Sequence, residues 1–297
     1  MKTNINKKRR RRNNLWGYTF TAPSAILLFV FIVLPIFISV ALSLTDFTGF
    51  NEPVFVGFKN YMDMFKDKKF LASMKNTFVY VLATVPLQTI LSLVVAAILA
   101  EKFKNAFGEF IRGTMFIPVL CSAVIAGNLF FYLFASDKNA VINSLLMLVG
   151  LDKMNWLGKS HLAMTVICLV AIWKNVGYFM VIFYAAIMDV PQTLHEAARI
   201  DGASPMQRFF NITMPSIRPV LYLVITLSTI WAFQVFDITM VMTKGGPGTA
   251  TMSPVLLVYN YAFSDHRMGY ASAIACLLAV VIFVISMLQK LVFREED

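Results

Sequence analysis

The chain has 297 residues, of which 58% are hydrophobic and only 14% are charged, and its formal net charge is +10. This composition lies outside the range of soluble domains, so it excludes a soluble enzyme or a soluble binding domain as the whole protein. Because each helical span takes about 20 residues, six spans with their loops fill the chain. The sequence predicts an all-α polytopic membrane protein with one membrane domain.

A run of basic residues opens the chain and accounts for much of the positive charge. It comprises Lys7, Lys8 and the four arginines at 9–12, directly before an apolar stretch. Such a run is typical of a cytoplasmic anchor that follows the positive-inside rule and attracts anionic lipid. We expect residues 1–17 to be a cytoplasmic segment beside membrane lipid. Nucleic-acid binding, the other use of basic runs, is not expected, because the charge is not spread along a face.

Six apolar segments follow in order, and each predicts one membrane span. Pro35 lies inside the first, and Pro86 and Gln88 interrupt the second. A proline in a membrane helix is tolerated where neighbouring groups satisfy the freed carbonyl. The spans are expected at about 18–44, 77–100, 113–135, 162–187, 219–242 and 269–293.

The connections between these spans are mixed in composition. Residues 45–73 are expected to form an ordered loop or at most a short surface helix. Glycines and a proline at 245–248 predict a turn, and residues 254–263 could form an interfacial helix. A short charged tail, 294–297, ends the chain.

Orientation follows from the distribution of lysine and arginine. With the amino terminus inside, the inside segments hold 15 of the 26 basic residues: seven before the first span, three in each of two loops and two at the end. The positive-inside rule therefore predicts that both termini are cytoplasmic. It places the segment 189–219, between the fourth and fifth spans, on the cytoplasmic side as well.

The segment 189–219 is polar and carries residues that are typical of helix starts and ends, which predicts a stiff structure. We call this segment the elbow. Pro191 suits the first turn of a helix and Gly202 suits the position just after a helix end, which predicts a helix over about 191–201. Ser204 and Gln207 have the spacing of a capping box, so a second helix begins there. Pro215 is expected to end that helix.

Two charged residues lie inside the predicted spans. Lys174 is near the middle of the fourth span and Asp237 is in the fifth. A cation at this depth costs about 2.5–3.5 kcal/mol on insertion scales, so it must face protein or water. A buried Lys174–Asp237 pair would satisfy both charges, as would contacts with a partner subunit; a direct role with substrate remains the alternative.

Aromatic and amide side chains gather in the same two spans. A ring face beside hydrogen-bonding amides suits a sugar, which has apolar C–H faces and a polar hydroxyl edge. Ordinary packing, with polar side chains bonding across helices, explains the same pattern. The residues are Asn175 and Tyr178 on one face of the fourth span, and Ser228, Trp231, Ala232 and Val235 on one face of the fifth with Gln234 beside them.

No arrangement of residues predicts catalysis or a resident cofactor. The three cysteines and three histidines are scattered, without disulfide or metal spacing. Residues 158–160 imitate the end of a phosphate-binding loop, but Lys153 stands where its first glycine should be. A hydrolytic triad is also lacking, so we expect no enzyme, no metal and no bound nucleotide in this chain.

Two groups of residues at fixed spacings carry a resemblance to a known family. The first group is Glu196, Ala197, Ala198, Asp201, Gly202, Ala203, Ile212, Pro215 and Pro219; the second is Phe233, Phe236, Asp237, Thr243, Gly245–Gly248 and Gly269–Ser272. The first group resembles the EAA loop of the membrane subunits of bacterial ATP-driven importers. The second resembles the carbohydrate-uptake branch of that family, in particular its maltose- and glycerol-phosphate-type first permease.

This resemblance implies a type I importer permease in the bacterial cytoplasmic membrane. Two permeases would pair, each elbow would dock on one of two ATPase subunits that bind ATP and Mg, and an extracytoplasmic binding protein would deliver substrate. ATP-driven closure of the ATPase pair would then rock the spans to alternate access. Glu196 would make charged contacts at the docking cleft, Ala197 and Ala198 would permit close approach, and Gly202 would let the chain turn.

The resemblance also implies a sugar half-site on the spans that flank the elbow. By matching positions it falls on Asn175 and Tyr178 and on Ser228, Ala232 and Val235. The last two are apolar where related proteins can carry amides, so they say little about which sugar binds. Import of glycerol-3-phosphate or a related polyol by the same architecture is an alternative, and an ion-coupled secondary transporter that uses Lys174 and Asp237 is a second one.

Overall fold

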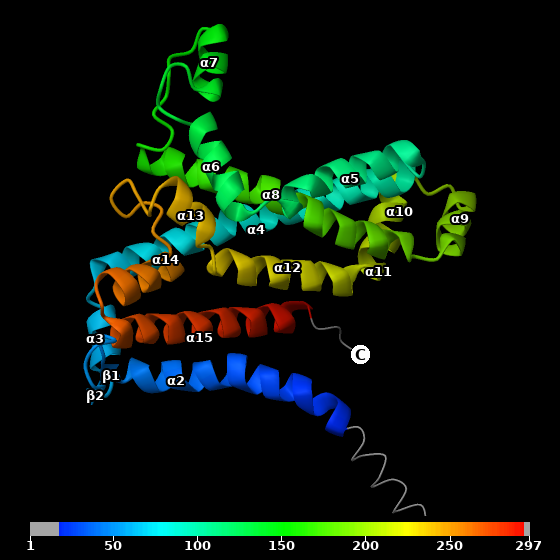
Figure 1. Ribbon diagram of the computed structural model, residues 1–297. Helices are drawn as coiled ribbons and strands as arrows, with labels where there is room; N and C mark the ends of the chain where they lie inside the picture. Colours follow the sequence, from blue (N-terminus) through cyan, green and yellow to red (C-terminus); the bar gives the residue numbers. More distant parts are fainter. Residues whose placement is uncertain (1–17, 294–297) are drawn as a thin grey trace, which may run out of the picture.

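The computed structural model describes residues 18–293 as a bundle of long helices with, in that range, one pair of short strands (Figure 1). The predictions made for residues 1–17 and 294–297 lie outside the described residues. Helices long and apolar enough to cross a membrane are Tyr18–Ser43, which contains η1 (Phe29–Val33) and α2 (Leu34–Ser43), α4 (Lys68–Lys102), α8 (Ser160–Met188), Arg218–Met242 and α15 (Met268–Phe293). The all-α membrane fold is confirmed.

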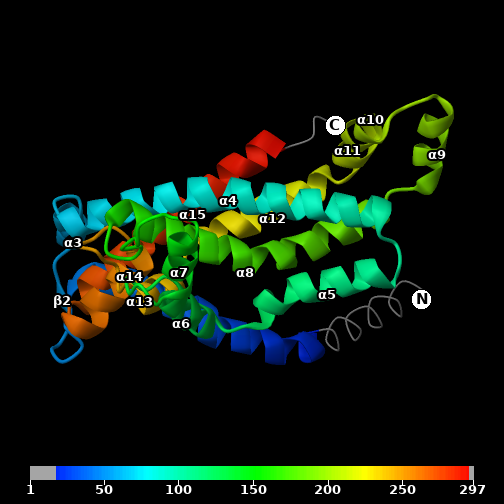
Figure 2. The same ribbon diagram turned by 90° about the horizontal axis from the view of Figure 1, so that it is seen from above.

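The long helices lie side by side, and the shorter elements gather at the two ends of the bundle (Figures 1 and 2). The elbow end carries α9 (Gln192–Ile200), α10 (Pro205–Arg208), η2 (Phe209–Thr213) and α11 (Met214–Ser216). The opposite end, which we call the hairpin end, carries β1 (Thr45–Asp46), β2 (Val54–Phe55), α3 (Lys59–Met64), α14 (Pro254–Tyr259) and η3 (Asn260–Ser264).

The first connection is more ordered than the sequence predicts. β1 and β2 pair antiparallel, with Thr45 opposite Phe55, and α3 follows them. α4 then begins at Lys68, nine residues before the predicted start of the span, because the Asp67 carboxylate caps it and accepts a 2.8 Å hydrogen bond from the backbone N–H of Lys69. Pro86 does not interrupt α4, which is one continuous helix.

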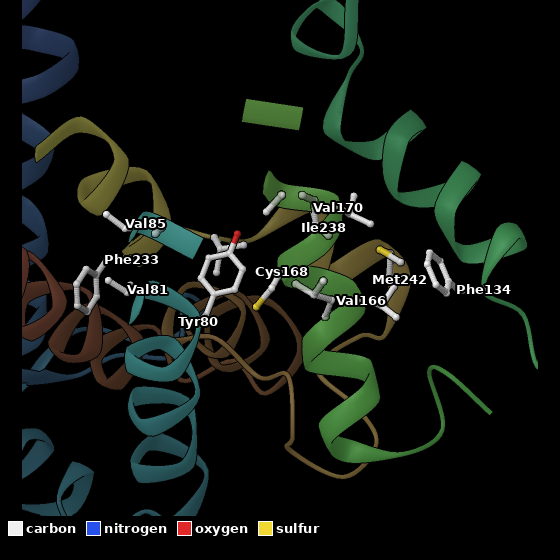
Figure 3. Close-up of a cluster of buried hydrophobic side chains, with 14 of the residues drawn as sticks. Tyr80, Val81, Val85, Phe134, Val166, Cys168, Val170, Phe233, Ile238 and Met242 are labelled. Carbon is white, nitrogen blue, oxygen red and sulfur yellow. The ribbon is translucent and has the colours of Figure 1, made fainter. Parts of the chain in front are cut away.

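A hydrophobic core joins α4, α8 and the fifth span. Figure 3 shows Val81 and Val85 from α4 and Val166 and Val170 from α8, with Phe233 among the side chains that complete the core. Inside a membrane such a core is stabilised by close van der Waals packing rather than by release of water. It fixes the relative positions of the helices that flank the elbow.

The third span, expected at about 113–135, is broken into two helices. α5 (Ala106–Leu120) and α6 (Ala123–Leu133) meet at an angle of 94°. Cys121 has an extended backbone, and the Ser122 hydroxyl accepts a 3.3 Å hydrogen bond from the N–H of Val124 to cap α6. A short helix, α7 (Val141–Leu148), follows before α8.

The fifth span is also interrupted, although the sequence predicts one continuous helix over 219–242. α12 (Arg218–Phe233) ends early, and α13 (Asp237–Met242) starts after a short break. The Ser253 hydroxyl donates a 2.7 Å hydrogen bond to the Val235 carbonyl inside this break. The helix predicted at 254–263 is present as α14 and η3, and residues 245–248 form the predicted turn.

Candidate functional site

The first helix of the elbow ends in a tight, fully bonded turn. Gly202 has a φ of +79°, the left-handed region that favours glycine. Its N–H bonds to the Arg199 carbonyl at 3.1 Å, and the N–H of Ala203 bonds to the Ala198 carbonyl at 2.8 Å. This pair of bonds is the Schellman motif, which satisfies carbonyls that a helix end leaves free. The predicted helix and its glycine stop are confirmed.

The second helix of the elbow begins with the predicted capping box. Gln207 N–H donates to the Ser204 hydroxyl at 3.3 Å, and Ser204 N–H donates to the Gln207 side chain at 2.7 Å. Pro215, however, does not end this helix. The wide π-turn η2 restarts the helical register at Met214, so Pro215 falls in a first turn, where its missing N–H is tolerated.

The elbow projects from the bundle, and most of the surface of its first helix is accessible (Figure 1). Within the described residues, no side chain of α9 is buried. Ile200 is 86% exposed and Met206 is 66% exposed, although both are apolar. Of the six predicted coupling residues, four are exposed and two are half-buried; the exposed ones are Glu196, Ala197, Asp201 and Gly202, and the half-buried ones are Ala198 and Ala203.

Two aromatic rings meet between α8 and α12 at membrane depth. The ring centroids of Tyr178 and Trp231 are 5.1 Å apart, at an interplanar angle of 47°. Trp231 is 41% exposed, and the Phe179 ring packs against it with a centroid distance of 5.5 Å. Asn175 is half-buried one helical turn before Tyr178. The two helices therefore present an accessible aromatic surface with an amide beside it.

The residues predicted to share this face on the fifth span are separated by the structure. Ser228 is fully buried, and Ala232 and Val235 are 6% and 9% exposed, all against the chain's own core. Trp231 and Gln234 are turned outward. The reason is geometric: positions i and i+4 share one stripe of a helix, and the stripe of Ser228 and Ala232 packs inward. Val235 is buried in the break beyond the end of α12.

The residue that holds Ser228 is not among the predicted site residues. Gln88 on α4 is 2% exposed, and its amide donates a hydrogen bond to the Ser228 hydroxyl. One turn further along α4, the Ser92 hydroxyl donates a 2.9 Å bond to the Val176 carbonyl of α8. In the sequence Gln88 stands out only as an interruption of an apolar run, although a glutamine at this depth signals a cross-helix hydrogen bond.

Lys174 is bound within its own chain. Its ammonium group donates a 3.3 Å hydrogen bond to the Val119 carbonyl, which lies in the last turn of α5 and so lacks a helical partner. Asp237 is exposed in the first turn of α13, and within residues 18–293 it forms no ion pair with Lys174. The pair that the sequence suggests is therefore not present. Lys174 supports the α5–α6 break instead.

A polar cluster fastens the hairpin end. The Asp67 carboxylate accepts hydrogen bonds from the hydroxyls of Tyr261 at 2.6 Å and Tyr270 at 3.0 Å. Partial burial alone would raise the pKa of Asp67, but the bonds from Tyr261, the Lys69 backbone and Tyr270 outweigh it and lower the pKa. Arg267 lies 4.4 Å above the Tyr270 ring. The start of α4 is thereby joined to η3 and α15.

Known proteins resemble this chain over nearly all of its length. Residues 55–295 match the family described as binding-protein-dependent transport system inner membrane component. The chain is 33% identical over 286 residues to the probable ABC transporter permease protein YurN of Bacillus subtilis (strain 168), covering 95% of this chain and 97% of that protein. It is 34% identical over 298 residues to the trehalose/maltose transport system permease protein MalF of Thermococcus litoralis, covering 100% of both.

A solved structure shares the fold. It is a bacterial alginate ABC transporter in complex with an alginate pentasaccharide-bound periplasmic protein, matched with a TM-score of 0.85 over 96% of each chain at 21% sequence identity. At this identity the likeness concerns the fold, which is that of a type I importer permease.

Proposed function

This chain belongs to the family of binding-protein-dependent transport system inner membrane components, and from that premise we propose that it forms half of a pathway that imports a sugar or oligosaccharide. The chain is a permease and not itself an enzyme. ATP and Mg are bound and ATP is hydrolysed in two partner subunits, a second permease completes the pathway, and an extracytoplasmic binding protein delivers the substrate. Both termini and the elbow face the cytoplasm of a bacterial cell, and the basic start lies against membrane lipid.

The elbow is the proposed docking element for an ATP-binding subunit. Its stiffness supports this role, because the Schellman motif and the capping box fix both of its helices relative to each other. Exposure of Glu196 and Ala197 leaves the docking face free. A rigid, exposed segment can carry movement from a partner into the spans on either side of it.

The observation that carries the carbohydrate proposal is the aromatic pair of half-buried Tyr178 and exposed Trp231. Ring faces pack against the apolar C–H faces of a sugar, and Asn175 and Gln234 are placed to bond its hydroxyls. Ser228, Ala232 and Val235 are buried within the chain in this conformation and are not part of this exposed face. Relatives named for trehalose, maltose or alginate transport add to the case.

Import of glycerol-3-phosphate or a related polyol is the second candidate, and it needs a cation for the phosphate. Lys174 is the one basic residue within 162–188, and its ammonium has donors beyond the one that bonds to Val119. The ion-coupled secondary transporter is disfavoured, because within the described residues the charge pair on which that hypothesis depended is absent.

The proposal is tested in proteoliposomes that contain the complete importer. We expect uptake of an oligosaccharide only with ATP, both permeases and the loaded binding protein. Tyr178→Ala and Trp231→Ala should each lower uptake about threefold or more without loss of assembly. The matched control is Tyr222→Ala, an aromatic residue on α12 that packs on Phe293 away from the proposed site.

Two results would contradict the proposal. Uptake by this chain alone under an ion gradient would make it a secondary transporter. Uptake kinetics that are unchanged in both aromatic variants would return these rings to a packing role. Thermal stabilisation of the binding protein by glycerol phosphates but by no sugar would select the second candidate.

A further inference from the structure

One ion pair ties the elbow to a helix that is distant in the sequence. Arg208, at the end of α10, places its guanidinium 3.2 Å from the Glu101 carboxylate at the end of α4. Within residues 18–293 it is the one ion pair that joins distant segments, since Glu109 and Arg112 are neighbours on α5. The Arg208 side chain is 11% exposed and that of Glu101 is 50% exposed.

Arg208 also holds the turn of the elbow itself. Its second terminal nitrogen donates a 3.3 Å hydrogen bond to the carbonyl of Ala203, the residue just after Gly202. The planar guanidinium thus bridges two fixed acceptors, which restrains its position more than a lysine would be restrained. The turn between the two elbow helices is therefore connected directly to α4.

Packing between the elbow and α4 is incomplete around this ion pair. A cavity of about 130 Å³ separates them, and it is lined by side chains from the ends of α4 and α8 and from both elbow helices. Across a gap of this kind, dispersion contacts transmit little force. The polar link from Arg208 spans the gap, beside the apolar cluster in which Ile212 and Met214 of the elbow pack with Leu99 of α4. It is therefore a direct polar contact through which a shift of the elbow can reach α4.

Toward the middle of the membrane, α4 is bonded to both helices of the proposed sugar site. Ser92 bonds to the Val176 carbonyl, two residues before Tyr178, and Gln88 bonds to Ser228, three residues before Trp231. α4 runs without a break from these bonds to Glu101. Because a continuous helix moves as a rigid element, a displacement of Glu101 also displaces Gln88 and Ser92.

We propose that the Arg208–Glu101 pair couples the elbow to α4, making α4 a route by which ATP-driven movement reaches Tyr178 and Trp231. This route acts beside the direct chain connections through α8 and α12, and it rests on the proposed function. Arg208 and Glu101 are positioning residues: they touch neither substrate nor nucleotide. Because the Glu101 side chain is half-exposed, its part in the pair is screened by solvent and adds little to stability, so replacing Glu101 should affect coupling more than folding.

The experiment measures substrate taken up per ATP hydrolysed by the complete importer. Glu101→Gln is the primary variant, because Glu101 is outside the elbow and half-exposed. We expect Glu101→Gln and Arg208→Ala each to lower the ratio about three- to tenfold, with the ATP-binding subunits still bound and active. The double variant should be no worse than the more severe single variant.

Lys104→Ala is the matched control, because Lys104 lines the same cavity and within the described residues forms no ion pair. Its ratio should equal that of the wild type. The proposal is overturned by an unchanged ratio in Glu101→Gln, by additive single effects, or by loss of ATP-binding subunits from Glu101→Gln. A wild-type complex that imports no carbohydrate refutes the proposed function instead.

Discussion

The amide of Gln88 donates a hydrogen bond to the hydroxyl of Ser228, and this bond joins α4 to α12 inside the membrane. Both side chains are almost completely buried, at 2% and 0% exposure. The contact explains why Ser228, although a position implied for sugar binding, faces the interior of its own chain. It also makes the role of Ser228 separable by experiment.

Ser228→Ala should destabilise the chain by about 1 kcal/mol, because it leaves the Gln88 amide buried without this acceptor. When Ser228→Ala is combined with Gln88→Leu, the loss of stability should be smaller than the sum of the two single losses, because the double variant leaves neither partner of this bond unpaired. Denaturant or thermal unfolding in detergent measures both. Thr226→Val is the control, because its buried hydroxyl has no partner among the described residues. A changed apparent affinity for sugar at unchanged stability would assign Ser228 to substrate.

Lys174→Met should loosen the break between α5 and α6, because the Val119 carbonyl loses its donor. The native Cys121 at the break reports on this directly, once Cys168 and Cys276 are replaced by alanine. Its rate of maleimide labelling should rise about fivefold, as expected for loss of one hydrogen bond to a charged donor. Lys174→Arg keeps a donor and should label like the parent. Equal labelling of all three proteins would mean that Lys174 does not support the break.

Gly202→Val should weaken docking far more than Gly202→Asn. The φ of +79° strains any β-branched residue, whereas asparagine adopts this region readily. A Cβ at this position would meet no atom within 4 Å, so the difference is one of backbone conformation and not of contact inside the chain. Co-purification of the ATP-binding subunits measures it. Equal retention of these subunits by both variants would show that the elbow does not need its left-handed turn.

Asp67 should stabilise the hairpin end only while it is ionised. Its folded-state pKa is lowered, so the contribution is present above the unfolded pKa of about 3.9 and is lost as the pH falls through the folded-state value. Asp67→Asn should therefore cost about 1 kcal/mol at pH 7, after allowance for solvent screening, and the difference should vanish at strongly acidic pH. Asp63→Asn on α3 is the control. A difference that persists at low pH would mean that packing, not charge, is lost.

Local chemistry made the elbow predictable. The left-handed turn at Gly202 and the capping box of Ser204 and Gln207 involve only residues that are close in sequence. Their structural roles therefore follow from spacing alone. The six apolar runs likewise predicted where helices form. Pro215 does not end the helix, because the π-turn before it places Pro215 in the first turn of the next helical segment. No local sequence signal predicts such a π-turn.

Long-range contacts made the membrane-depth site unpredictable. The breaks after Leu120 and Phe233 depend on partners such as Lys174 and Ser253, which lie far away or beyond the break in sequence. Periodicity shows which residues of α12 share a stripe, but not which stripe turns inward. The stripe that turns inward is determined by contacts with Gln88 and with the core around α4. Only the folded chain brings these residues together.

The 94° bend between α5 and α6 determines which side of the subunit can meet lipid. Hydrocarbon offers no donors, so backbone carbonyls freed at a broken span must find protein or water. Lys174 supplies one donor at Val119, and any further carbonyl freed at the bend would need a neighbouring subunit or an aqueous passage on that side. The helix Tyr18–Ser43 can face lipid without such a partner. Within the described residues, no part of its most apolar stretch is buried. The lipid annulus of the importer is accordingly expected along this helix, with the bend turned toward the centre of the assembly.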